Sequence, residues 1–194
     1  MHFNPRIYHT IILCFIRNAD KRAEYLRKHR IFASIGNNCS IMNRKVPLYA
    51  KLIKLGNNVH LASKVDFTTH DAIHGMLNNI ETVTPSEKYP ERLGCIEIGN
   101  NVFVGASTQI LYNVKIGSNV IIGAHSLVNK DIPDGCVAAG VPAKIIGKFE
   151  DFVNKRKTLK EQYPKELKPM NQTISSELEK LMWEDFYQQR QNKK

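Results

Sequence analysis

A histidine stands at a point in this chain where a reactive side chain would be exposed and held rigidly. His70 lies in the run FTTHD, residues 67–71, at the fourth position of a six-residue unit that begins at Phe67. We expect this position to point outward, and the inward fifth position to fall on Asp71, whose carboxylate is costly to bury. The regular structure should therefore break at once, which leaves His70 on its last ordered turn. An imidazole titrates near neutral pH and can take the proton of an attacking hydroxyl group.

The residues that follow His70 have no repeat phase. Residues 71–94 form an insertion of 24 residues, and so long an excursion from a compact structure is usually functional. His74, four residues after His70, either lines a substrate pocket or is solvated. The group that orients the second ring nitrogen of His70 stays open between a backbone carbonyl and several carboxylates. Those carboxylates are Asp71, Glu81 and Glu87.

The elements that must position His70 are encoded in a period of six residues. From Ile98 the chain stacks as IGNNVF, VGASTQ, ILYNVK, IGSNVI, IGAHSL, VNKDIP, DGCVAA and GVPAKI. The first position is aliphatic through Val128, the second is Gly in five of the eight units, and the fifth is small or β-branched through Ala138. Neither a helical period nor a simple alternation generates this pattern. The same phase recurs in IGNNCS (35–40), LGNNVH (55–60) and LASKVD (61–66).

This period predicts a solenoid of short strands. A strand that turns one aliphatic side chain inward, bends at a corner and repeats would bury a continuous ladder of aliphatic side chains. Asn and Gly at the corners tolerate the positive φ angles that tight turns need. Residues 4–30 should form an amphipathic helix that covers the open end of the solenoid, although a membrane attachment would use the same basic face.

The length and composition fit one domain with extensions. The chain has 194 residues, of which 42% are apolar and 24% charged, as in soluble globular proteins. We expect a helical cap over residues 1–34, an all-β core over 35–147 with the insertion 71–94 as a protruding loop, and a helical extension over 148–194. The formal net charge is +10, but residues 31–147 carry 10 basic and 8 acidic side chains. The basic excess therefore lies at the two ends, and no nucleic-acid interface is expected.

Cysteine usage and hydropathy indicate a cytoplasmic protein. The four cysteines form no CxxC pair and no dense framework, which is typical of reduced thiols. The most apolar early stretch, residues 7–16, is ten residues long, whereas a spanning helix needs roughly 20. No small-x-small cleavage site follows it, so neither a signal peptide nor membrane association is expected.

The repeat units resemble those of the hexapeptide-repeat acyltransferases, and in particular the cytoplasmic sugar O-acetyltransferases of the galactoside, maltose and surface-polysaccharide type. The runs IGNNVFVGAS and IGSNVIIGAHSLVNKDIPDGCVAAGVPAKIIG closely match that family's C-terminal signature over residues 98–147, and residues 35–70 match more loosely. The resemblance implies a left-handed parallel β-helix of triangular coils, with three hexapeptides per coil. Members of the family are trimers with each active site between two subunits, so it also implies a homotrimer.

The same resemblance implies a chemistry. Acetyl-coenzyme A would donate an acetyl group to a sugar hydroxyl in surface-polysaccharide biosynthesis, with no metal required. His70 matches the family's catalytic histidine, a general base that works without an acyl-enzyme, and Asp71 and His74 fall in the acceptor region. The cofactor contacts of the family fall on Ala106, Ala124, Asn129, Lys130 and Lys144. Asn129 stands where relatives commonly have Thr and lacks that hydroxyl, and a plainer interpretation of Lys130 and Lys144 is a pair of solvated corner lysines.

Three other functions remain open. An N-acetyltransferase acting on an amino sugar would use the same base and the same groove. A zinc lyase resembling the γ-class carbonic anhydrases would need three histidines on coil surfaces, whereas only His70 and His74 are close in sequence and they stand at a loop. The remaining histidines on the repeats are His60 and His125. A non-catalytic scaffold would need no signature such as the VNKDIP and GVPAK runs.

Overall fold

The structure is a computed structural model that describes residues 4–81, 83–158, 163–169 and 173–191. The chain divides into two compact units, Met1–Phe152 and Val153–Lys194. The helix α4 (Phe149–Thr158) crosses the boundary between them. The repeats and the insertion all belong to the first unit, which therefore carries every residue that the sequence singles out for chemistry.

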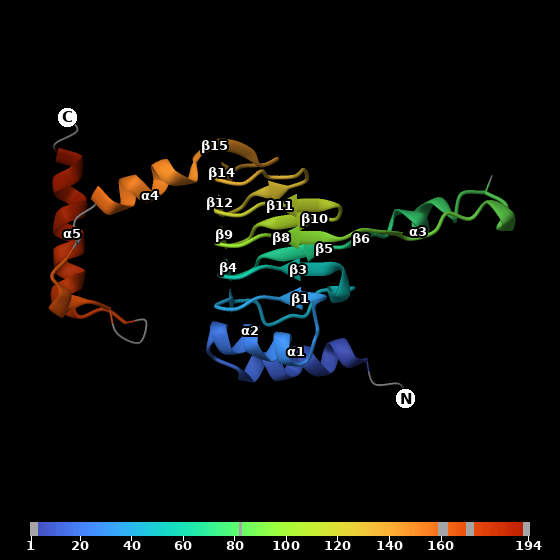
Figure 1. Cartoon of the computed structure of the whole chain (residues 1–194), viewed down its shortest axis with the longest axis horizontal. Coiled ribbons are helices and arrows are strands. Elements are labelled where there is room, and N and C mark those ends of the chain that lie inside the picture. The colour runs from blue at the N-terminus through green and yellow to red at the C-terminus, as the bar shows by residue number, and fades with distance from the viewer. Residues whose placement is uncertain (1–3, 82, 159–162, 170–172, 192–194) are drawn as a thin grey trace. The chain divides into compact units, whose positions relative to one another are not determined.

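The first unit is a parallel β-helix whose strands form three sheets (Figure 1). Every strand of the coils pairs in parallel with the equivalent strand of the next coil, and within the described part of these three sheets only β15 runs antiparallel to its neighbour. The first sheet contains β1 (Ser34–Ile35), β3 (Ile53–Leu55), β8 (Ile96–Ile98) and β11 (Val114–Ile116). The second contains β2 (Ser40–Ile41), β4 (Val59–Leu61), β9 (Val102–Val104), β12 (Val120–Ile122), β14 (Cys136–Ala139) and β15 (Lys144–Lys148). The third contains β5 (Asp66–Thr68), β10 (Gln109–Leu111) and β13 (Leu127–Val128).

The register fixes the length of a coil. Ile96 pairs with Val114 in the first sheet, and 114 − 96 gives 18 residues, or three units of six. In the third sheet Asp66 pairs with Gln109, and 109 − 66 gives 43 residues, because the insertion lies between them. The expected coil of three hexapeptides is therefore present, and the insertion leaves and rejoins the stack without shifting it.

The core is the ladder that the period of six predicts. First-position aliphatic side chains are buried from coil to coil, with Ile98 1% exposed and both Ile116 and Ile122 0% exposed. Small polar side chains at the fifth position stay inside because their hydroxyls are satisfied. Thr108 Oγ1 donates to the Gly123 carbonyl at 3.0 Å, and Ser126 Oγ donates to the same oxygen at 2.8 Å. Burial of apolar area at these positions supplies the main stabilisation of the stack.

Fourth-position residues and second-position glycines have different roles at the corners. Residues at the fourth position adopt positive φ angles of 55° to 60°, as expected of the bend. They are Asn38, Asn58, Lys64, Asn101, Ser107, Asn113, Asn119 and His125. Among the second-position glycines Gly135 adopts a positive φ of 70°, as expected, whereas the others do not, so the expectation is wrong for them. They are needed because coils approach closely: a Cβ on Gly99 would lie 2.8 Å from the carbonyl oxygen of Gly117.

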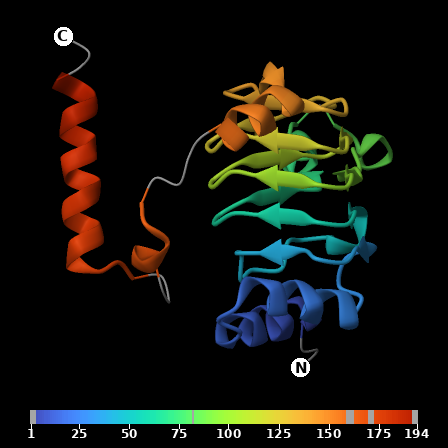
Figure 2. The same cartoon turned by 60° about the vertical axis from the view of Figure 1, so that its left-hand side comes forward.

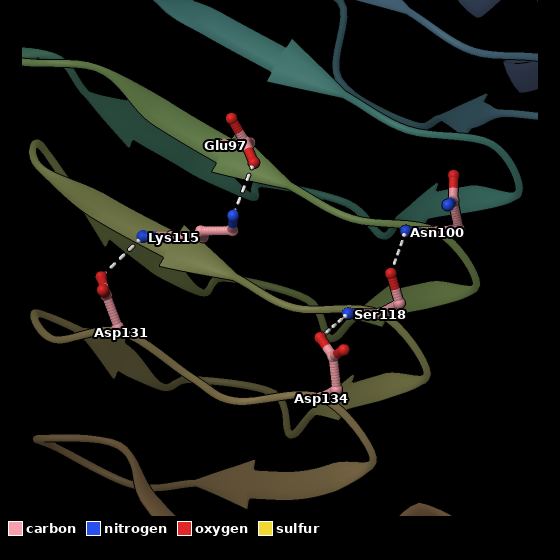
Figure 3. A network of polar contacts seen from close by, with 6 residues as sticks. All are labelled: Glu97, Asn100, Lys115, Ser118, Asp131 and Asp134. Carbon is pink, nitrogen blue, oxygen red and sulfur yellow. Dashed lines mark hydrogen bonds and ion pairs between the residues drawn. The ribbon is translucent and has the colours of Figure 1, made fainter.

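Polar side chains at the corners tie one coil to the next. The backbone amide of Asn100 donates to Ser118 Oγ at 3.0 Å, and the backbone amide of Ser118 donates to Asp134 Oδ1 at 2.7 Å (Figure 3). On the adjacent sheet the amide of Lys115 donates to Asp131 Oδ1 at 2.8 Å. Each side chain thus satisfies a backbone donor of the preceding coil, which rigidifies the corners that carry exposed residues.

Two helices rather than one lie at the N-terminal end of the stack (Figure 2). The chain breaks between α1 (Pro5–Phe15) and α2 (Ala19–Lys28), where the Asn18 side chain accepts from the amides of Asp20 and Lys21 and starts a new helix. Arg22 of α2 is 1% exposed, and its guanidinium donates to the carbonyl of Ile41 at 2.8 Å. That contact fixes the helices to the first coil.

The insertion protrudes sideways from the stack (Figures 1 and 2). Its base is a two-stranded antiparallel ladder of β6 (His70–Asp71) and β7 (Arg92–Leu93). Between these strands lie α3 (Ile73–Leu77) and the 3₁₀ turn η2 (Pro85–Glu87), and a further turn, η1 (Ala50–Leu52), precedes β3.

The second unit holds the 3₁₀ turn η3 (Lys165–Leu167) and the helix α5 (Ser176–Gln191), where the rings of Trp183, Phe186 and Tyr187 pack together. No helix in the described ranges is both long enough and apolar enough to cross a membrane.

Candidate active site

His70 lies where the chain leaves the coil. The fourth-position residues Asn113 and His125 adopt positive φ angles, whereas His70, also at a fourth position, does not and instead begins strand β6. In the ladder of β6 and β7, His70 pairs with Leu93. One residue earlier, the carbonyl of Thr69 accepts from the amide of Gly94 at 3.0 Å. The insertion therefore begins and ends beside His70, on the rigid edge of the third sheet.

Asp71 does not take the inward fifth position that the repeat phase assigns to it. The buried polar residue is Thr69, which is 0% exposed and donates from Oγ1 to the carbonyl of Leu48 at 2.7 Å. Asp71 is partly exposed, and its Oδ2 accepts from the hydroxyl of Tyr112 at 2.9 Å. The backbone leaves the coil at His70, so the carboxylate never meets the core, and the predicted break of the coil is confirmed.

An aromatic ring orders the imidazole of His70. The ring of Tyr49 stands edge-on to the ring of His70, with centroids 5.3 Å apart and planes at 87°. The Tyr49 hydroxyl donates to Glu91 Oε2 at 2.7 Å, which anchors Tyr49 to the returning end of the insertion. Nδ1 of His70 is buried and has no hydrogen-bond partner among the described residues.

None of the carboxylates considered for orienting His70 hydrogen-bonds to its ring within the described chain. Asp71 is engaged by Tyr112, and Glu87 accepts from the hydroxyl and the amide of Thr84. The group that orients the His70 ring therefore stays open, because its buried Nδ1 has no hydrogen-bond partner among the described residues.

Two phenols flank the site, and their carboxylate partners keep them protonated. The hydrogen bond to Glu91 raises the pKa of Tyr49, because ionisation would place a phenolate against a carboxylate. The hydrogen bond to Asp71 raises the pKa of Tyr112 in the same way, while Arg92, 5.5 Å from the centre of the Tyr112 ring, acts in the opposite direction. Both hydroxyls are therefore donors at neutral pH.

The sequence analysis missed both tyrosines. Tyr112 could have been found, because the pairing of Phe67 with Ile110 places it one coil away from Thr69, beside the insertion. Tyr49 carries no such signal. It lies between the first two coils, outside the repeat phase, and only the return of the insertion brings Glu91 to it.

His74 lies on the first turn of α3, within the insertion. Its side chain is partly buried, and its Nδ1 is buried without a hydrogen-bond partner among the described residues. The ring is therefore not fully solvated, and its place in a substrate pocket stays a prediction.

The residues that match the family's cofactor contacts lie at two separate places on the coils. Ala106 and Ala124 occupy the same corner in successive coils, after β9 and β12, and the carbonyl of Ala106 accepts from the amide of His125 at 2.8 Å. Asn129 and Lys130 follow β13 of the third sheet, and Lys144 begins β15. In the described part of the chain neither lysine forms an ion pair, and both are exposed.

These positions have the character that an extended anionic ligand requires. Methyl side chains at stacked corners leave the backbone accessible, and two unpaired ammonium groups are suited to phosphate oxygens. Within one chain, however, Ala106 and Ala124 lie at the corner between the second and third sheets, whereas His70 lies where the third sheet ends. The structure brings His70 together with Asp71, and Ala106 with Ala124, but it places the two pairs at opposite ends of the third sheet's strands.

The histidines considered for a zinc site are dispersed. His60 lies on β4 of the second sheet and bonds to Asn58, and His125 lies at an exposed corner. Across the described residues, no three side chains of His, Cys, Asp or Glu lie close enough to hold one metal ion.

Comparison with known proteins places the chain among bacterial transferases. Residues 96–130 match the family model described as bacterial transferase hexapeptide (six repeats). Protein CapG of Staphylococcus aureus is 38% identical over 131 residues, which cover 65% of this chain and 72% of CapG. The galactoside O-acetyltransferase of Lactococcus lactis subsp. lactis (strain IL1403) is 32% identical over 155 residues, covering 70% of this chain and 72% of that enzyme.

A solved structure shares the fold. Galactoside acetyltransferase in complex with coenzyme A superposes with a TM-score of 0.51 and 26% sequence identity, over 77% of this chain and 82% of that one. The similarity therefore extends well beyond the repeats matched by the family model.

Proposed function

Because the chain belongs to the hexapeptide-repeat family of bacterial transferases, we propose that it is an acetyltransferase that moves an acetyl group from acetyl-coenzyme A to a hydroxyl of a sugar. The observation that carries this proposal is the position of His70. Its imidazole lies at the rim of a rigid coil, at the base of a long insertion, with one ring face ordered by Tyr49. A histidine held in this way is suited to general base catalysis.

The cosubstrate and the chain supply different parts of the reaction. When bound, acetyl-coenzyme A supplies the activated acyl group. His70 removes the proton of the acceptor hydroxyl as the oxygen attacks, and then returns a proton to the sulfur of the departing thiol. No side chain needs to carry the acyl group, because the acceptor and the cosubstrate are held together. His70 is the first residue of strand β6, and the pairing of β6 with β7 holds its backbone in place.

The cosubstrate site comprises Ala106, Ala124, Asn129, Lys130 and Lys144. The fit of these residues to coenzyme A supports this assignment: small side chains at stacked corners accept an extended pantetheine arm, and the free lysines accept its phosphates. The relative whose structure holds coenzyme A has the same coil architecture. Acceptor binding falls to the insertion, where Asp71 and His74 lie closest in sequence to the base.

We also propose the assembly that the family resemblance implies, a homotrimer of left-handed β-helices in a cytoplasmic enzyme, with each active site between two copies. The separation of His70 from the corner of Ala106 and Ala124 within one chain supports this proposal, since a second copy could bring that corner to His70. The cap over residues 1–34, the coils over 35–147 and the extension over 148–194 are the proposed functional divisions.

The galactoside O-acetyltransferase similarity and the match to CapG support a sugar acceptor, and a surface-polysaccharide unit is the class we propose. The test presents matched hydroxyl sugars and amino sugars to the purified chain with acetyl-coenzyme A and follows the release of free thiol. Transfer to hydroxyl sugars is the expected result. Transfer to amino sugars alone would make the enzyme an N-acetyltransferase, and carbon dioxide hydration that depends on bound zinc, without thiol release, would make it a lyase.

A further inference from the structure

A cavity of about 620 Å³ lies beside the candidate active site and takes no part in the chemistry described so far. It opens between the N-terminal helices and the segment that joins the first two coils. Its basic lining residues are Arg6, Arg30 and Lys51, and two imidazoles, His9 and His29, also face it. None of the described residues that line it is acidic.

The basic groups in this cavity are not neutralised by the chain. In the described ranges no carboxylate forms an ion pair with Arg6, Arg30 or Lys51. Among the described residues Nε of Arg6, a buried atom, has no hydrogen-bond partner. Lys51 Nζ donates to the backbone carbonyl of Arg30. Guanidinium and ammonium groups that no carboxylate pairs with are suited to phosphate oxygens.

The cavity shares a wall with His70. Tyr49 lines the cavity and also presents its ring to the ring of His70. Leu93 lines it as well, and pairs with His70 in the ladder of β6 and β7. Leu48, another lining residue, accepts through its carbonyl from the hydroxyl of Thr69, the residue before His70. The cavity therefore borders on residues that also contact the base or its neighbour Thr69.

We propose that this cavity binds the phosphate of the acceptor, so that the acceptor is a sugar carrying a phosphate ester at its anomeric carbon. This inference rests on the proposed acetyl transfer and names its substrate class. Guanidinium groups bind phosphate oxygens in a bidentate manner. Apolar lining residues such as Pro47 and Leu52 would contact the nucleoside or lipid group attached to the phosphate. Both a sugar nucleotide and a polyprenyl diphosphate sugar carry such a phosphate ester at the anomeric carbon.

The first test measures binding by calorimetry on the full chain, with saturating coenzyme A present so that the cosubstrate site is filled. Pyrophosphate is the probe for the shared chemistry, and UDP-galactose and farnesyl diphosphate are the probes for the two sources. We expect pyrophosphate to bind, and Arg6→Gln and Arg30→Gln each to weaken it about tenfold, as loss of a charge-assisted hydrogen bond implies. Lys28→Gln, an exposed change on α2 outside the cavity, is the matched control and should bind as the parent does.

The two other probes assign the source. Tighter binding of UDP-galactose than of pyrophosphate would indicate a sugar nucleotide, and tighter binding of farnesyl diphosphate would indicate a lipid-linked sugar. If none of the three probes binds, or if Arg6→Gln and Arg30→Gln both bind pyrophosphate as tightly as the parent, the inference is overturned.

The second test is kinetic and separates this inference from the proposed function. The ratio of kcat/KM for galactose 1-phosphate to that for methyl galactoside should exceed one in the parent and fall about tenfold in Arg6→Gln. The ratio should not change in Lys28→Gln. Acetyl transfer with no preference for the phosphate would overturn the inference and leave the proposed function intact. Absence of transfer to any acceptor, with pyrophosphate still bound, would instead contradict the proposed function and with it the substrate class.

Discussion

The ring of Tyr49 meets the ring of His70 edge-on, with centroids 5.3 Å apart and planes at 87°. Tyr49 lies in the segment between the first two coils, and its contact limits the rotation of the imidazole about its side-chain bonds. The Tyr49 hydroxyl in turn bonds to Glu91 at the far end of the insertion. The position of the proposed base therefore depends on three segments that are distant in the sequence.

Removing the Tyr49 ring should slow the reaction without abolishing it. Tyr49→Ala leaves the His70 imidazole free to rotate, and we expect kcat to fall about tenfold, since loss of orientation alone has effects of this order. Tyr49→Phe keeps the edge-on contact and should retain most of kcat. Steady-state kinetics with both variants checks this. Equal losses in the two variants would show that the hydroxyl, and not the ring, is what matters.

The contact between Tyr112 and Asp71 predicts that the stability of the fold falls at alkaline pH. The pKa of Tyr112 is raised in the folded state by its hydrogen bond to Asp71, so this contribution to stability is complete below the ordinary tyrosine pKa of about 10 and is lost as the pH rises through the raised value. In Asp71→Asn the anionic partner is gone, and Tyr112 should ionise at lower pH.

Ultraviolet titration of the parent and of Asp71→Asn at 295 nm measures this ionisation. Tyr112→Phe supplies the control, because its curve subtracted from that of the parent isolates the residue. Identical titration curves for the parent and Asp71→Asn would contradict the assigned partner.

The close approach of the coils at Gly99 predicts a loss of stability. A Cβ at Gly99 would lie 2.6 Å from Ser118 Oγ and 2.8 Å from the carbonyl oxygen of Gly117, so the coils would have to separate. We expect Gly99→Ala to lower the free energy of unfolding by about 1–3 kcal/mol, the usual effect of overpacking. Gly147→Ala is the matched control, because nothing lies within 4 Å of its added methyl group. Urea unfolding compares the two, and equal midpoints would contradict this role for Gly99.

The exposed lysines at the proposed cosubstrate site predict a change in KM. Lys130→Ala combined with Lys144→Ala should raise KM for acetyl-coenzyme A about tenfold, since contacts to phosphate are charge-assisted, and should change kcat little. The difference between variant and parent should shrink at high salt. Lys54→Ala, on the first sheet, is the matched control. An unchanged KM in the double variant would identify both lysines as solvated corner residues.

The repeat architecture could be predicted from the sequence because burial recurs with the same period as the residue types. Ile98, Ile116 and Ile122 are buried for the reason that the period of six implies. The break of the coil after His70 is also visible in the sequence, since Asp71 does not suit an inward position. A fixed phase does not show at which residue the backbone leaves its coil, and the structure puts this point at His70.

The surroundings of His70 could not be predicted. Tyr49, Glu91 and Leu93 lie outside the repeat phase, and they meet His70 only because an irregular insertion returns to the coil from which it departed. Such contacts depend on the path of a loop and not on a local period. For the same reason the cationic cavity was not foreseen: Arg6 comes from α1, Arg30 from the turn after α2, and Lys51 from η1.

The most direct test of the account is the activity of His70→Ala, measured as release of free thiol from acetyl-coenzyme A in the presence of a sugar acceptor. We expect the rate of transfer to fall by about 10² or more, as removal of a general base implies, while calorimetry shows that coenzyme A still binds. Full activity in this variant would contradict the assignment of His70 as the base.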